Sequence, residues 1–157
     1  MSLAEREAAT QRIHKLEVEQ HLKLARRTAK GLLLLLPDVD GLKQINDTCG
    51  HQRGDEALVE AANILKGAFR ASDIVARIGG DEFAVIAIEA WQESIETLRA
   101  RIRQRVEEAQ AKRPSPSYRL SFSVGAAYAD PTRLPPLDEL LAQADRTLYE
   151  QKGLVKK

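Results

Sequence analysis

Cysteine is almost absent from this sequence, which has only Cys49 among its 157 residues. A single cysteine excludes a disulfide framework and a cysteine-based metal site within one chain, and it fits a reducing compartment. Long apolar runs are also missing, since the longest, from Gly31 to Pro37, is far too short to cross a bilayer. The charged, helix-forming N-terminal residues do not resemble a signal peptide. We therefore expect a cytoplasmic protein without membrane contact.

An excess of charge of one sign is absent as well. The formal net charge is +1, from 24 basic and 23 acidic residues, so no overall field attracts nucleic acid. The basic residues do not form the stripe that is typical of nucleic-acid binders. We expect no nucleic-acid partner.

The remaining composition is that of a globular protein with one core. Hydrophobic residues make up 43% of the chain and charged residues 30%, and the length suits a single domain. Residues 4–30 are rich in good helix formers. We expect residues 1–30 to form an N-terminal helix or connector, packed near its end and projecting near its start. Residues 31–157 are expected to form the domain.

Apolar periodicity predicts alternating strands and helices in residues 31–157. The run Leu32–Leu36 suits a strand that is buried on both faces, and Trp91 begins a stripe that continues through Ile95 and Leu98 at helical spacing. The predicted elements are strands at 32–36 and 119–128, a hairpin at 73–88, a helical turn at 43–47, and helices at 54–69, 91–111 and 137–152. This order favours an α+β domain with a split β-α-β layout and helices flanking one sheet.

A glycine pair lies in the predicted hairpin. Gly79 and Gly80 separate two apolar runs, and glycine lets the backbone turn sharply and lets a ligand approach closely. Asp81 and Glu82 follow at once, and carboxylates beside an open turn suit hard divalent cations. A lone motif of this kind is more often an exposed acidic turn, so the other motifs have to decide.

A second polar cluster follows the buried strand. Asp38 stands at the predicted end of this strand, opposite the hairpin carboxylates, which invites a cation between them. Asp40 and Asp47 belong to the same cluster, but a role in turns or helix caps would explain them equally well.

Three motifs occur in register along the chain. Asp-x-Asp-x-x-Lys-x-Ile-Asn-Asp begins at Asp38, Gly-His-x-x-Gly-Asp ends at Asp55, and Arg-x-Gly-Gly-Asp-Glu-Phe begins at Arg77. In this order and spacing they resemble the GGDEF family of diguanylate cyclases. The resemblance extends from about Leu22 to the C-terminus.

The resemblance implies a palm-like, ferredoxin-like sheet with flanking helices and a β-hairpin that carries the family motif. It also implies a diguanylate cyclase, which condenses two GTP molecules into cyclic di-GMP and releases two pyrophosphates. Each protomer of a homodimer would bind one GTP, with two Mg²⁺ (or Mn²⁺) ions per active site serving the attacking and leaving oxygens. A sensor domain upstream of this chain would control the activity.

The family pattern also implies roles for the acidic residues. Asp38 and Asp81 would hold metal together with the carbonyl of Val39. Glu82 would bind the second metal and help to deprotonate the attacking 3′-hydroxyl, so Glu82 and Asp81 are the expected catalytic residues.

The substrate contacts are implied in the same way. Asn46 and Asp55 would read the guanine edge, because a carboxylate accepts from N1–H and the 2-amino group, which adenine does not offer there. Gly79 and Gly80 would leave room for the nucleotide. The lysines expected near the phosphates are Lys43, Lys152 and Lys156; a surface role explains Lys43 equally well, and Lys156 stands where the family has an arginine.

An Arg-x-x-Asp sequence, Arg70 to Asp73, precedes the hairpin in the register of the family's inhibitory product site. This resemblance implies that cyclic di-GMP binds there and inhibits. An Arg–Asp pair at a helix end is also common without any ligand. Arg99 and Arg101 are candidates for a second arginine of this site.

The chain departs from the family at both ends. It lacks the Asp-x-Leu-Thr-Gly-Leu-x-Asn-Arg stretch with which the family usually opens, and its C-terminal motif is altered. One alternative is therefore a catalytically impaired GGDEF domain that binds GTP or cyclic di-GMP as a regulatory module. Another is a structural dimerisation module built on the N-terminal helix, which would bind no nucleotide.

Overall fold

The computed structural model describes residues 17, 19–88, 90–112 and 118–155. The predicted projecting start of the N-terminal helix lies outside these residues. In chain order the elements are a helix over residues 19–28, β1 (Leu32–Val39), α2 (Leu42–Cys49), α3 (His51–Ala68), β2 (Ile74–Gly79), β3 (Glu82–Ile88), α4 (Ser94–Ala111), β4 (Phe122–Ala129) and α5 (Leu137–Val155). None of these helices is both long and apolar enough to span a membrane.

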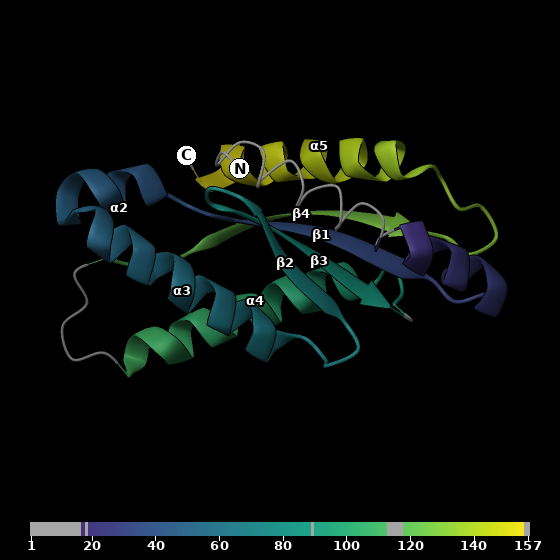
Figure 1. The fold of residues 1–157 in the computed structure, drawn as a ribbon, viewed down its shortest axis with the longest axis horizontal. Helices are drawn as coiled ribbons and strands as arrows, with labels where there is room; N and C mark the ends of the chain where they lie inside the picture. Colours follow the sequence, from purple (N-terminus) through teal and green to yellow (C-terminus); the bar gives the residue numbers. More distant parts are fainter. Residues whose placement is uncertain (1–16, 18, 89, 113–117, 156–157) are drawn as a thin grey trace, which may run out of the picture.

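The four strands form one sheet in the order β2-β3-β1-β4, and each neighbouring pair is antiparallel. The β1–β2 and β3–β4 connections each run through helices and skip one strand, so two split β-α-β units interleave. Helices α3 and α4 cover one face of the sheet and α5 covers the other (Figure 1). The predicted α+β, ferredoxin-like architecture with a β-hairpin is confirmed.

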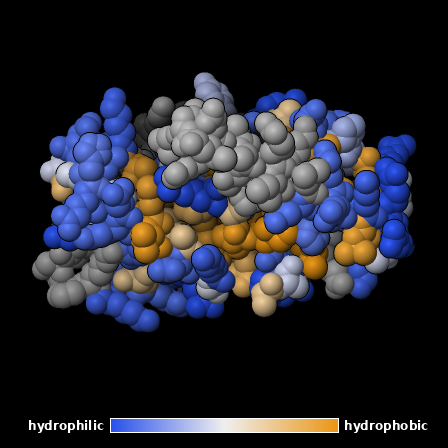
Figure 2. All heavy atoms as spheres, viewed as in Figure 1, coloured by the Kyte–Doolittle hydropathy of each residue, from blue (hydrophilic) through white to orange (hydrophobic). Residues whose placement is uncertain are grey.

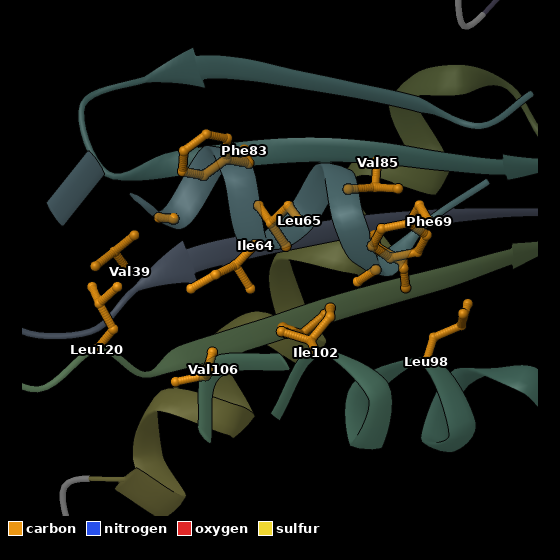
Figure 3. Packing of buried hydrophobic residues seen from close by; sticks show 14 of the residues in the cluster. Val39, Ile64, Leu65, Phe69, Phe83, Val85, Leu98, Ile102, Val106 and Leu120 are labelled. Carbon is orange, nitrogen blue, oxygen red and sulfur yellow. The ribbon is translucent and has the colours of Figure 1, made fainter. Parts of the chain in front are cut away.

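The leucines of β1 supply a core on each face of the sheet. Leu33 and Leu35 pack with residues of α3 and α4, whereas Leu32, Leu34 and Leu36 pack with residues of α5. The α5-side core also includes Leu22 and Ala25 from the helix at residues 19–28. Figure 3 shows the other core, where the labelled residues come from α3 and the residue after it, α4, β3, the end of β1 and the segment before β4: Val39, Ile64, Leu65, Phe69, Phe83, Val85, Leu98, Ile102, Val106 and Leu120.

Strand β1 continues through Pro37 to Val39, three residues beyond the predicted end. Val39 donates its N–H to Asp81 on the hairpin side, and Asp40 donates to Ser121 on the β4 side. Because strand donors alternate sides, the missing N–H of Pro37 falls toward β3. The β1–β3 pairing is interrupted there, between Leu35 and Asp38, while the β4 ladder runs on without a gap. A proline is therefore tolerated in a central strand.

Two glycines shape the connection from β1 to α3. Gly41, with φ of 68°, precedes α2, and Gly50, with φ of 90°, separates α2 from α3. Residues with a Cβ atom rarely adopt these left-handed angles. Since α3 begins at His51 rather than at the predicted residue 54, Gly54 and Asp55 lie in its first turns.

Helix α4 begins at Ser94, three residues later than predicted. Trp91 lies in the preceding turn, where its carbonyl accepts the N–H of Ser94 at 2.9 Å. Because it precedes the helix, Trp91 does not share the buried stripe of Leu98 and Ile102, and it is 67% exposed. The prediction that Trp91 starts this stripe is wrong.

Candidate functional site

Three carboxylates meet at one end of the sheet. Asp38 of β1 pairs directly with Glu82 of β3, so both side chains lie on the α5 face. Asp81 lies in the two-residue turn of the hairpin, and its carbonyl accepts the N–H of Val39 at 2.9 Å. This bond ties the turn to the end of β1. Predicted catalytic and metal-binding residues from two distant segments are thereby brought to the same place.

Burial and mutual repulsion hold these carboxylates in an unfavourable setting. Asp38 is only 5% exposed. Burial raises the pKa of Asp38, and the hydrogen bond to Lys152 lowers it by a smaller amount. Repulsion from Asp81 raises it further, and the resulting pKa is about 6. The pKa of Glu82 is raised by burial and by the negative charges of Asp145, Asp38 and Asp81. Such a cluster favours a bound cation.

A cation of the chain itself already contacts Asp38. The Lys152 ammonium, from the last turns of α5, lies 3.0 Å from Oδ1 of Asp38. Burial disfavours the charged ammonium, but the hydrogen bond and attraction of Asp38, with attraction from Asp81, raise the pKa of Lys152 above its ordinary value. Lys152, predicted to contact phosphates, thus neutralises the buried carboxylate here. Lys156 lies outside the described residues.

The donor chemistry of the cluster fits a hard divalent ion, for which carboxylate and carbonyl oxygens are the preferred ligands. The Lys152 ammonium contacts Asp38 as a bound metal cation would. Among the described residues, however, no three His, Cys, Asp or Glu side chains are grouped closely enough to hold a metal ion. Asp38, Asp81 and Glu82 therefore share one end of the sheet without forming a closed set of side-chain ligands.

Asp40 has a structural role that the sequence left undecided. Its carboxylate accepts the hydroxyl of Ser121 at 2.7 Å and that of Ser123 at 2.6 Å. These bonds anchor the end of β1 to the start of β4, beside Asp38. Sequence reasoning missed both serines; the available signal was two hydroxyls alternating with apolar residues in a predicted strand.

The corner between α2 and α3 places Asn46 against Gly54, the residue before Asp55. A Cβ atom at Gly54 would lie only 1.6 Å from Oδ1 of Asn46, so the Asn46 side chain rests on the glycine next to Asp55. Asp55 and Lys43 are exposed. In Figure 1 the hairpin turn lies toward the same end of the molecule as α2 and the C-terminal end of α5.

Gly79 and Gly80 border open space. A Cβ atom at either position would meet nothing within 4 Å, and neither glycine has a positive φ. The turn therefore does not use the left-handed backbone angles that favour glycine. Arg77 braces the turn by donating from Nε to the Gly80 carbonyl at 3.0 Å. Room beside the backbone is the property that the glycines supply.

Arg70 and Asp73 form a turn that is fastened to the end of β3. The carboxylate of Asp73, only 3% exposed, accepts the backbone N–H groups of Arg70 at 3.0 Å and of Ile88 at 3.2 Å. The Arg70 side chain is 56% exposed and lines an open pocket of about 550 Å³ that Arg101 also lines. Arg99 points elsewhere and donates twice to the Val124 carbonyl of β4. Of the two arginine candidates, Arg101 is thus the one beside Arg70.

The protein surface has apolar and polar regions side by side. Figure 2 shows apolar residues gathered across the middle of the visible face, with polar residues below them and toward both ends of the molecule. Two partly buried apolar side chains of β2, Ile74 and Ile78, pack against the α5-side core. Neither contributes a group to the carboxylate cluster.

Comparison with known proteins identifies the family of this chain. The family model "Diguanylate cyclase, GGDEF domain" matches residues 8–156. Diguanylate cyclase DosC of Escherichia coli (strain K12) is 42% identical over 131 residues, which cover 82% of this chain and 28% of that protein. The chain thus spans well under two thirds of this curated relative.

Solved structures agree with the sequence comparison. The GGDEF domain of PA1120 (YfiN or TpbB) from Pseudomonas aeruginosa has a TM-score of 0.79 at 30% identity, covering 90% of this chain and 88% of that one. A structure on the interaction between a microbial GGDEF domain and bis-(3,5)-cyclic di-GMP has a TM-score of 0.65 at 29% identity, covering 88% and 86%.

Proposed function

The chain belongs to the GGDEF family of diguanylate cyclase domains, and on this premise we propose that it condenses two GTP molecules into cyclic di-GMP and two pyrophosphates. The observation that carries the proposal is the meeting of Asp38, Asp81 and Glu82 at the end of β1, with Lys152 as the local cation. Acidic side chains that are buried or lie close together destabilise a fold unless a bound cation neutralises them, so such a cluster indicates a functional site.

The carboxylates have distinct roles in this proposal. Asp38, Asp81 and the Val39 carbonyl would hold Mg²⁺ or Mn²⁺, with Glu82 serving a second ion. When bound, the ions supply charge neutralisation at the attacking and leaving oxygens. Glu82 accepts the proton of the 3′-hydroxyl, and its raised pKa makes it a better base than an ordinary exposed glutamate.

Nucleotide selection falls to the α2–α3 corner. Asp55 accepts from the guanine N1–H and 2-amino groups, and Asn46, fixed against Gly54, completes the contact with the base edge. The open space at Gly79 and Gly80 admits the nucleotide close to the turn. When GTP binds, Lys152 leaves Asp38 and contacts the triphosphate. Lys43 and Lys156 add positive charge near the phosphates.

Two protomers face each other in the proposed reaction, because each binds one GTP and each 3′-hydroxyl attacks the other nucleotide. Product binding at Arg70 and Asp73, with Arg101 as the second arginine, would inhibit the enzyme. The interaction of another GGDEF domain with cyclic di-GMP supports binding of the product by this domain. The domain at residues 31–157 would work in the cytoplasm, with residues 1–30 connecting it to an upstream sensor.

A regulatory module without turnover is the second candidate. It is favoured by the Lys152 contact with Asp38 and by the lack, among the described residues, of three closely grouped side-chain ligands. The experiment that separates the two is incubation of the domain with GTP and Mg²⁺, followed by chromatography of the nucleotides, with ATP and a chelator as controls. Cyclic di-GMP that forms with GTP and Mg²⁺, but neither with ATP nor in the presence of the chelator, supports the cyclase. Saturable GTP binding without product would support the regulatory module.

A further inference from the structure

The single tryptophan of the chain is exposed at a fixed position. Trp91 is 67% exposed, although a side chain of this size is usually well buried. Its backbone is held on both sides, because Ala90 donates to the Gly31 carbonyl at 3.1 Å and Ser94 donates to the Trp91 carbonyl at 2.9 Å. The indole is therefore presented to solvent from an anchored turn between β3 and α4.

Trp91 lines the same pocket as the two arginines. The pocket, of about 550 Å³, lies between the Arg70–Asp73 turn, the end of β3 and the start of α4, and Trp91, Arg70 and Arg101 share its wall. A volume of this size lies within the range of small-molecule sites. An aromatic ring and two guanidinium groups thus face one hollow.

Both arginines are positioned by main-chain acceptors. Arg70 donates from Nη2 to the Ile88 carbonyl, and Arg101 donates from Nη1 to the Ala68 carbonyl at 3.2 Å. A guanidinium has five N–H donors, so one such bond leaves several for a ligand. The carboxylate of Asp73 is already used by two backbone N–H groups. Asp73 therefore fixes the turn, whereas the arginines and the indole line the pocket together with the polar side chains of Glu93, Ser94 and Thr97.

We propose that Trp91 is the stacking surface of this pocket, on which one guanine base of bound cyclic di-GMP lies. An indole face stacks on any purine, and a guanidinium can bind the O6 and N7 edge of guanine or a phosphate with two parallel hydrogen bonds. This combination suits a nucleotide that carries both flat bases and negative charge. The inference rests on the proposed product site, and it adds a residue that neither the family motifs nor the sequence pattern assigned.

The tryptophan itself provides the test. Because it is the only one in the chain, its fluorescence reports on this pocket alone. The domain is titrated with cyclic di-GMP without GTP or divalent metal, and binding is measured in parallel by calorimetry. We expect saturable quenching of Trp91 at the ligand concentration at which calorimetry shows binding.

Substitution gives the second readout. Trp91→Ala should weaken cyclic di-GMP binding by about 5-fold to about 140-fold, the range found when an aromatic residue that stacks on a base is truncated. Trp91→Phe should retain most of the affinity, because it keeps a stacking ring. Tyr149→Ala, which truncates another exposed aromatic residue on α5, is the matched control and should bind like the parent.

The outcomes separate the two proposals. Binding that is lost in Arg70→Ala but unchanged in Trp91→Ala, without quenching, overturns the stacking role and leaves the product site standing. An absence of cyclic di-GMP binding in the parent domain overturns both the product site and the inference. Loss of affinity in Trp91→Ala with retention in Trp91→Phe supports the inference.

Discussion

The buried carboxylate of Asp38 should make the fold less stable than it could be. Its pKa in the fold is about 6, against an ordinary value of 3.8, because burial disfavours the charged form. At 1.36 kcal/mol for each pKa unit, this difference corresponds to about 3 kcal/mol. The attraction of Lys152 is already contained in that pKa. Replacing Asp38 by the neutral isostere Asn should therefore stabilise the metal-free domain by up to about 3 kcal/mol at neutral pH.

The gain should depend on pH in a definite direction. A folded-state pKa above the unfolded one means that the fold binds the proton more tightly. The stability that Asp38 contributes is therefore complete below about pH 4 and is lost as the pH rises through about 6. Asp38→Asn and the parent should be similar in stability at the acid end and should diverge between these values.

Urea unfolding followed by circular dichroism, in the presence of a chelator, measures this difference. Asp47→Asn, which removes an exposed carboxylate from α2, is the control and should change stability by less than about 0.5 kcal/mol. Mg²⁺ should stabilise the parent and leave Asp38→Asn unaffected. If Asp38→Asn is less stable than the parent at pH 7.5, loss of the Lys152 pair outweighs burial of the charge and the reasoning is wrong.

Three further substitutions separate the functions of the site. Glu82→Gln should bind GTP normally but lose about 100-fold or more in turnover, because the amide cannot accept a proton; product chromatography at saturating GTP measures this, and full turnover would remove the assigned role. Gly54→Ala should raise the KM for GTP, since its Cβ displaces Asn46, and an unchanged KM in a GTP titration would show that Asn46 does not contact the substrate. Arg70→Ala should relieve inhibition by cyclic di-GMP while the initial rate stays the same, and inhibition that persists in a progress curve with added product would show that the turn at Arg70 is only structural.

Much of the fold could be predicted from local patterns. The five leucines of β1 indicated a strand buried on both faces, and the glycine pair located the hairpin turn. The prediction ended β1 too early at Pro37, because pairing on one side can continue where the other side is interrupted. Trp91 was misplaced because spacing alone cannot show where a helix begins.

The carboxylate end of the site was also predictable, since strand order and turn position bring Asp38 and Asp81 together. The contacts between distant segments were not. The ion pair between Lys152 and Asp38 and the meeting of Arg101 with Arg70 depend on how helices pack on the sheet, and the anchoring of Asp40 by Ser123 depends on which strand lies beside β1. Periodicity fixes which face a residue occupies along its own element, but it does not fix which residue of another element lies opposite.

The most direct test is the initial rate of cyclic di-GMP formation from GTP and Mg²⁺, measured over a wide range of protein concentration. An active site shared by two protomers predicts that the rate rises more steeply than in proportion to concentration while the dimer is forming. Mg²⁺-dependent product with this steep dependence would support the cyclase. An absence of cyclic di-GMP at every concentration, in a folded sample that binds GTP, would contradict it.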